Sequence, residues 1–165
     1  MKPGAKRLLF LIVAAFVLFC DSQSKTWLGA RLAFSETLPI IPDFFHLTLI
    51  ENRGAAFGLL KESEWLFAVS GIFVIIIVIF VLSQSSKLLK GQIIAIGMIT
   101  GGAAGNFIDR FMYGAVLDFI DFRGIWPFIF NIADAAIVSG CILFAIYYVL
   151  SDYRKVEIPT RFDNE

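Results

Sequence analysis

The chain has 165 residues, of which 58% are apolar and only 17% are charged, whereas soluble domains carry about a quarter charged residues. Its 14 Lys and Arg residues balance 14 Asp and Glu residues, so no overall positive field favours nucleic acid as a partner. Cys20 and Cys141 both lie in apolar runs, which argues against a disulfide framework or a cysteine zinc site.

Apolar residues occur in four blocks along the chain. Residues 8–20 are uninterrupted and extend to about residue 28, residues 65–82 carry no charge, and residues 91–108 are uncharged but rich in Gly and Ala. Residues 128–150 contain Asp134 as their only charge. Because a helix needs about 20 residues to cross a bilayer, the blocks predict an all-α membrane protein of one domain, residues 1–165. Four transmembrane helices are expected, over about 8–28, 65–82, 91–111 and 130–150.

The first block also has features of a secretory signal, because Lys2, Lys6 and Arg7 precede it. However, the bulky residues Leu18 and Phe19 stand where a cleavage site needs small side chains, and three further apolar blocks follow. We therefore interpret residues 8–28 as a retained helix.

Basic residues predict the orientation of the helices. They lie in the N-terminal segment, in the link between the second and third helices, and in the C-terminal tail: Lys2, Lys6, Arg7, Lys87, Lys90, Arg154, Lys155 and Arg161. The positive-inside rule makes this side cytoplasmic, so both termini are expected there. Residues 29–64 and 112–129 are then extracytoplasmic. Within them, residues 45–50 (FHLTLI) are typical of a strand and residues 51–58 of a turn, which predicts a small extracytoplasmic β-containing subdomain.

Ionisable and amide side chains collect at the outer ends of these helices. The set comprises Asp21, Lys25, Asn106, Asp109, Arg110, Asp118, Asp121, Asn131 and Asp134. Asn106 and Asp109 are three residues apart, as are Asn131 and Asp134, so each pair shares a helix face. Small residues in 97–105 allow close helix approach, which brings the two pairs within reach of each other. Two carboxylates at one site share a proton, and such a pair can activate water and protonate a carbonyl oxygen.

Simpler interpretations account for several of these residues. Asn131 has the position of a helix N-cap, and Asp21 and Lys25 have the spacing of an ion pair within one helix. Asp109 and Arg110 fit an interfacial anchor, and Asp121 fits a solvated side chain. From spacing alone, an enzyme, an ion or proton pathway and a structural or partner-binding protein all remain open.

Ordered motifs narrow this choice. They are residues 21–25 (DSQSK), 52–58 (NRGAAFG), 105–110 (GNFIDR), 114–119 (GAVLDF) and 130–134 (FNIAD). With these motifs, over about residues 8–150, the chain closely resembles bacterial lipoprotein signal peptidases (signal peptidase II). The resemblance implies an aspartyl endopeptidase of the bacterial cytoplasmic (inner) membrane with its active site near the extracytoplasmic face. It also implies cleavage of diacylglyceryl-modified prolipoproteins before the lipidated cysteine, membrane lipid around the enzyme, no metal or other cofactor, and inhibition by peptide-like compounds of the globomycin type.

The resemblance also implies roles for single residues. Asp118 and Asp134 match the catalytic pair, and Asp21 and Lys25 match a motif that supports the structure. The remaining matches are substrate-binding or supporting positions: Asn52, Gly54, Asn106, Asp109, Arg110 and Asn131. Asp109 is a competing catalytic candidate, which we interpret as a group that orients Arg110. The positive pole at the start of the fourth helix favours a charge on Asp134, so we expect Asp118 to hold the shared proton.

Two features depart from the family pattern. Ser22 stands where Gln is common, and the interval from Asp118 to Asp134 is short for the family. The short interval implies a trimmed outer loop near the substrate.

Overall fold

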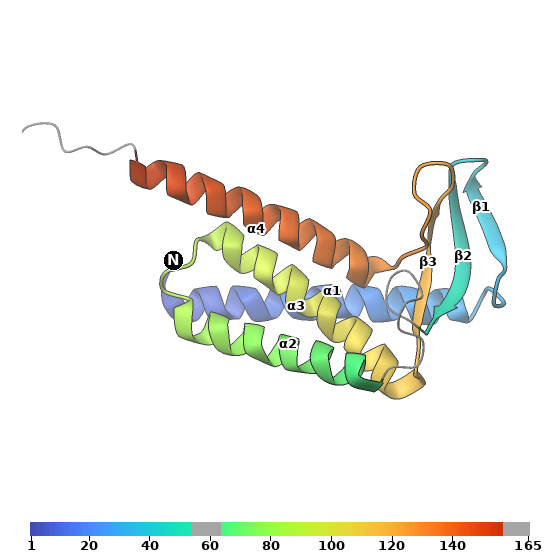
Figure 1. The fold of residues 1–165 in the computed structure, drawn as a ribbon, viewed down its shortest axis with the longest axis horizontal. Helices are drawn as coiled ribbons and strands as arrows, with labels where there is room; N and C mark the ends of the chain where they lie inside the picture. The colour runs from blue at the N-terminus through green and yellow to red at the C-terminus, as the bar shows by residue number, and fades with distance from the viewer. Residues whose placement is uncertain (54–63, 157–165) are drawn as a thin grey trace, which may run out of the picture.

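The computed structural model describes residues 1–53 and 64–156, which form helices lying alongside one another with a small sheet across one end (Figure 1). The elements in chain order are α1 (Pro3–Gly29), β1 (Thr37–Ile41), β2 (Phe45–Asn52), α2 (Glu64–Gln84), α3 (Lys90–Tyr113), β3 (Val116–Phe122) and α4 (Ile132–Val156). The N-terminus and the far end of α4 both lie at the end of the helices opposite the sheet (Figure 1). The sheet therefore covers the end at which the sequence places its polar cluster.

Three of the helices are long and apolar enough to cross a membrane: α1, α3 and the part of α4 over Ile132–Ser151. The apolar stretch described for α2, Gly71–Gln84, is shorter. The chain is thus a mostly helical, multi-pass membrane protein, and three of the four predicted spans have the expected length and composition.

Helix α3 is the centre of the helical part. In its most apolar stretch 61% of the residues are buried, against 11% in α1 and 17% in α4. Glycines make this central position possible, because a Cβ atom on Gly101 would overlap the carbonyl oxygen of Ala14 in α1. A Cβ atom on Gly102 would overlap the carbonyl oxygen of Ala133 in α4. The backbones of α1 and α4 therefore approach α3 at positions that admit no side chain.

The ends of α3 follow ordinary capping rules. Its first turn is closed by Gln92, whose side-chain Oε1 accepts the backbone N–H of Leu89 at 2.8 Å. Its last turn ends at Gly114, which has φ +70° and donates its N–H to the carbonyl of Arg110 at 2.9 Å. Glycine favours this left-handed conformation because it has no Cβ. Gly114 thus turns the chain from α3 directly into β3.

The sheet is antiparallel, with strand order β1-β2-β3. Its centre is β2, where Leu47 pairs with Leu38 on one side and with Ile120 on the other. A bulge interrupts the β2–β3 register between Leu47 and Ile50. A buried apolar cluster of Leu28, Leu49 and Phe119 fixes the sheet to the end of α1.

Several predicted boundaries are corrected by the structure. Helix α1 begins at Pro3 rather than near residue 8, because proline is well suited to the first helical position. Helix α4 continues beyond residue 150 to Val156. The predicted turn at 51–58 is wrong at its start, since β2 continues through Asn52 by pairing with Val116. Residues 54–58 of that turn, including Gly54, lie outside the described residues. Strands β1 and β3 were not predicted.

Replacing Gly102 with Ala should destabilise the protein by about 1–3 kcal/mol, because the added methyl group must displace the first turn of α4. Thermal unfolding of the purified protein in detergent measures this effect. Gly4→Ala is the matched control, since nothing lies within 4 Å of a Cβ atom there and alanine favours the helix. An equal melting temperature in the two variants would contradict the close α3–α4 packing.

Candidate active site

Asp118 lies on β3 where the sheet meets the helices, and only 1% of its surface is exposed. Its two carboxylate oxygens accept hydrogen bonds from two different asparagines. Asn52, at the end of β2, donates its Nδ2–H to Oδ2 at 2.9 Å. Asn131, just before α4, donates its Nδ2–H to Oδ1 at 2.6 Å. Strand pairing places Asn52 next to one oxygen of the Asp118 carboxylate, and the turn into α4 places Asn131 next to the other oxygen.

Asp134 lies in the first turn of α4 and is half-buried. Its Oδ1 accepts the Nδ2–H of Asn106 from α3 at 2.7 Å. Its backbone N–H donates to Oδ1 of Asn131 at 2.9 Å, so Asn131 is the N-cap of α4. Asn131 therefore has both of the roles that the sequence suggests. Its side-chain oxygen caps α4, and its amide N–H binds Asp118.

The two asparagines connect the two carboxylates. Asn131 Nδ2 also lies 3.3 Å from Oδ1 of Asn106, which completes a path from Asp118 through both amides to Asp134. Asn131 is fully buried and Asn106 is 6% exposed, so the bond between the two amides and the bond from Asn131 to Asp118 are shielded from water. The structure therefore brings the two amide–carboxylate pairs together, as the spacing of the sequence predicts, and adds Asp118, which only the family resemblance had placed there.

A buried ion cluster lies next to this path. Lys25 Nζ is 2.6 Å from Asp21 Oδ2 and 2.6 Å from Asp109 Oδ2. The predicted Asp21–Lys25 ion pair is therefore confirmed. Asp109 binds Lys25 rather than Arg110, whose bond to the carbonyl of Asn106 is long, at 3.4 Å.

Two further residues differ from the sequence interpretation. Asp121 is 9% exposed rather than solvated, because Thr48 donates to its Oδ2 at 2.7 Å and Arg123 at 3.2 Å. Gly105 has a role that the sequence does not indicate, because a Cβ atom there would lie 2.7 Å from Asp21 Oδ2. The sequence signal that could have identified Gly105 is its position directly before Asn106.

The environment of Asp118 raises its pKa. Burial away from water disfavours the charged carboxylate and is the largest cause, and the negative charge of Asp134 adds to it. Hydrogen bonds from Asn52 and Asn131 oppose the shift but do not cancel it, and the pKa of Asp118 rises from 3.8 to about 6. Asp118 is thus able to hold a proton close to neutral pH.

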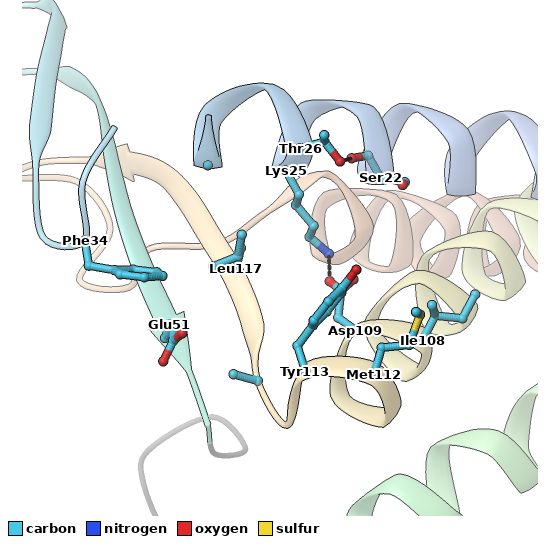
Figure 2. A pocket seen from close by; sticks show the side chains of 12 residues that line it. Ser22, Lys25, Thr26, Phe34, Glu51, Ile108, Asp109, Met112, Tyr113 and Leu117 are labelled. Carbon is cyan, nitrogen blue, oxygen red and sulfur yellow. Dashed lines mark hydrogen bonds and ion pairs between the residues drawn. The ribbon is translucent and has the colours of Figure 1, made fainter. Parts of the chain in front are cut away.

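A hollow of about 450 Å³ borders the ion cluster (Figure 2). Figure 2 shows Lys25 and Asp109 meeting on its wall, with Tyr113, Phe34 and Leu117 around them. The hollow lies between the C-terminal ends of α1 and α3 and the start of β3. Among the side chains that the structure describes, no three His, Cys, Asp or Glu residues are grouped as ligands for a metal ion.

The apolar helices, the small sheet and the buried acidic residues define a membrane enzyme with the features of an acid–base hydrolase. The family model for signal peptidase (SPase) II, a family of aspartic peptidases, matches residues 13–150, and the chain belongs to this family.

Relatives and solved structures agree with this assignment. The chain is 39% identical over 148 residues to the lipoprotein signal peptidase of Clostridioides difficile, which covers 90% of this chain and 99% of that protein. It is 40% identical over 151 residues to that of Desulfitobacterium hafniense, covering 90% and 97%. A bacterial membrane enzyme solved by the in meso method has a TM-score of 0.77 and 32% identity, covering 94% of this chain and 93% of that one.

The raised pKa of Asp118 predicts a carboxyl group that titrates near pH 6 in infrared difference spectra of the purified protein. The signal should be absent from Asp118→Asn and present in Asp121→Asn, which removes another buried carboxylate from the same strand. A wild-type spectrum with no titration between pH 5 and 7 would contradict the burial argument.

The same shift has a consequence for stability. Because the folded protein holds this proton more tightly than the unfolded chain does, ionisation of Asp118 opposes folding. Its contribution to stability is present below about pH 4 and is lost as the pH rises to about 6, a change of roughly 3 kcal/mol. The melting temperature of Asp118→Asn relative to wild type should therefore increase over this interval.

Proposed function

We propose that the chain is an aspartyl endopeptidase that removes signal peptides from diacylglyceryl-modified prolipoproteins and cuts before the lipidated cysteine. Asp118 and Asp134 are the catalytic pair in this proposal. The observation that carries it is the buried amide path that joins these two carboxylates where β3 meets α4. Family membership supports the substrate class, because the similar proteins are lipoprotein signal peptidases.

The chemistry divides between the two carboxyl groups. Asp134 accepts an N–H from Asn106 and lies in the first turn of α4, where the helix dipole stabilises negative charge. Asp118 is the partner that holds the shared proton more readily, because burial raises its pKa to about 6.

The ionised carboxylate takes a proton from water as the water oxygen attacks the scissile carbonyl carbon. The protonated partner gives its proton to the carbonyl oxygen, and a tetrahedral diol forms. The carbon–nitrogen bond then breaks as the nitrogen takes the proton first removed from water, and one hydroxyl of the diol returns its proton to the partner carboxylate. This leaves a carboxylic acid and an amine, and the pair again holds one proton. Because the two carboxyl groups exchange a single proton, the apparent pKa values belong to the pair as a unit.

Supporting roles follow from the contacts. Asn52, Asn106 and Asn131 bind the two carboxylates directly. Half-buried Arg110 lies one helical turn beyond Asn106. In this proposal Arg110 binds the substrate backbone. Gly54 and Asp109 complete the supporting set that the family resemblance implies.

The membrane arrangement completes the proposal. We assign α2 as a fourth span, both termini to the cytoplasm and the sheet to the outer face of the bacterial inner membrane. The basic N-terminal segment and the link between α2 and α3 lie at the end opposite the sheet, in agreement with the positive-inside rule (Figure 1). The acyl chains of the substrate then remain in lipid while its peptide reaches the pair, and globomycin-type peptides compete for the same place.

Asp118→Asn and Asp134→Asn should each lower cleavage of a synthetic lipidated preprotein by about 10²- to 10⁴-fold, because each removes one proton-transfer group. Asp121→Asn is the matched control and should cleave at the wild-type rate. Size-exclusion profiles in detergent establish that all three variants fold. Appreciable cleavage by either pair variant would refute the catalytic assignment. Equal cleavage of the unlipidated peptide would refute the proposed substrate.

Chelation provides a separate test. Both carboxylates face amide N–H groups rather than further metal-ligating oxygens, so we expect cleavage to be unchanged by EDTA. The measurement is the cleavage rate before and after dialysis against the chelator. A loss of activity that zinc or magnesium restores would overturn the two-carboxylate mechanism.

A further inference from the structure

We propose that Lys25 is a positioning residue that fixes the direction of the amides binding the catalytic pair. This inference rests on the proposed function, because it assigns Lys25 a part in the same reaction. Lys25 is 4% exposed and touches neither Asp118 nor Asp134. Its third contact, longer than those to Asp21 and Asp109, is with Oδ1 of Asn106 at 3.4 Å.

Asn106 could in principle bind in two orientations, because its oxygen and its NH₂ group have similar shapes. In the structure its Oδ1 faces two donors, the ammonium of Lys25 and the Nδ2–H of Asn131. If the amide were reversed, its NH₂ group would face the ammonium of Lys25 and the NH₂ group of Asn131, which are both donors. Its oxygen would then face the carboxylate of Asp134. Asn106 must therefore direct its N–H toward Asp134.

The positive charge matters most during the reaction. While Asp134 is ionised, its own negative charge holds the N–H of Asn106 in place. After it takes a proton from water, its new O–H group could instead donate to a reversed amide oxygen. Lys25 opposes that reversal in every protonation state, so the amide remains ready to receive the carboxylate when the proton leaves.

The ion cluster also fixes the start of α4. Asp21 Oδ2 accepts from Lys25, and its Oδ1 accepts the backbone N–H of Ala133, directly before Asp134, at 2.9 Å. One cluster thus connects α1, α3 and the first turn of α4. Gly105 provides the space for it, since a Cβ atom there would meet Asp21 Oδ2.

Lys25 has no capacity left to bind a ligand itself. An ammonium group has three N–H donors, and the three acceptors are Asp21, Asp109 and Asn106. The hollow in Figure 2 nevertheless borders Lys25, so truncation of its side chain should leave a space that small molecules can enter. This geometry permits a test by chemical rescue.

Lys25→Ala should lower kcat for a lipidated preprotein by about 10²-fold, with KM changed by less than about threefold, because the reacting groups are misplaced while substrate contacts remain. Ethylammonium or propylammonium added at millimolar concentration should restore at least about a tenth of the lost rate. Propanol, which has a similar size but no charge, should not. Ser24→Ala, in the same turn of α1, is the matched control and should keep the wild-type kcat.

A folded Lys25→Ala that no amine restores, or that propanol restores equally, would overturn the proposal. If this variant does not fold, Lys25→Met combined with Asp109→Asn preserves the net charge of the cluster and still removes the donor to Asn106. That double variant should fold with kcat reduced about 10²-fold, and a kcat within threefold of wild type would overturn the proposal. Asp118→Asn measured in parallel, with and without amine, separates the two ideas: activity in that variant refutes the catalytic pair whatever Lys25 does.

Discussion

The close approach of α1 and α4 to α3 is the constraint on which the rest of the structure depends. Gly101 and Gly102 present bare backbone to the two neighbouring helices, and no side chain could occupy either contact. At this separation, short side chains one turn farther along α3 reach both neighbours. Asn106 contacts Lys25 of α1 and Asp134 of α4 with a side chain only two carbons long. Wider packing would leave these buried polar groups without partners, which is costly in a membrane protein.

The sheet adds the second constraint. It covers the ends of the helices and is fixed to α1 through Leu28, Leu49 and Phe119. This position removes Asp118 from water and raises its pKa to about 6. The same strand pairing brings Asn52 to Asp118, so the element that desolvates the carboxylate also supplies one of its hydrogen bonds. The sheet therefore both buries the Asp118 carboxylate and supplies a hydrogen bond that offsets part of the cost of burying it.

The sequence predicts local relations better than it predicts which elements face each other. Residue spacing indicated that Asn131 and Asp134 share a helical turn, and the capping bond confirms it. Spacing also indicated the ion pair between Asp21 and Lys25, but not its bond to Asp109, because that contact depends on the rotation of α3 relative to α1.

The strands were difficult to predict for a related reason. Strand β1 contains Pro39, which is unusual within a strand except at a sheet edge. In β3, the odd spacing between Asp118 and Asp121 places carboxylates on both faces and disrupts the alternation that identifies a strand. The burial of Asp121 is missed for a related reason, since its partner Thr48 becomes a neighbour only when the sheet forms.

The use of asparagines next to the pair, with the lysine one contact farther away, has a physical reason. A lysine bound directly to both carboxylates would favour the state in which both are ionised, and no proton would remain for the carbonyl oxygen. An amide gives each carboxylate a hydrogen bond without adding a net charge, so the pair keeps one proton. The direction of an amide, however, is not fixed by its shape, and a charge one bond away provides that direction. Lys25 thus fixes the direction of the amides without binding either catalytic carboxylate. Asp118 and Asp134 therefore remain able to exchange a proton.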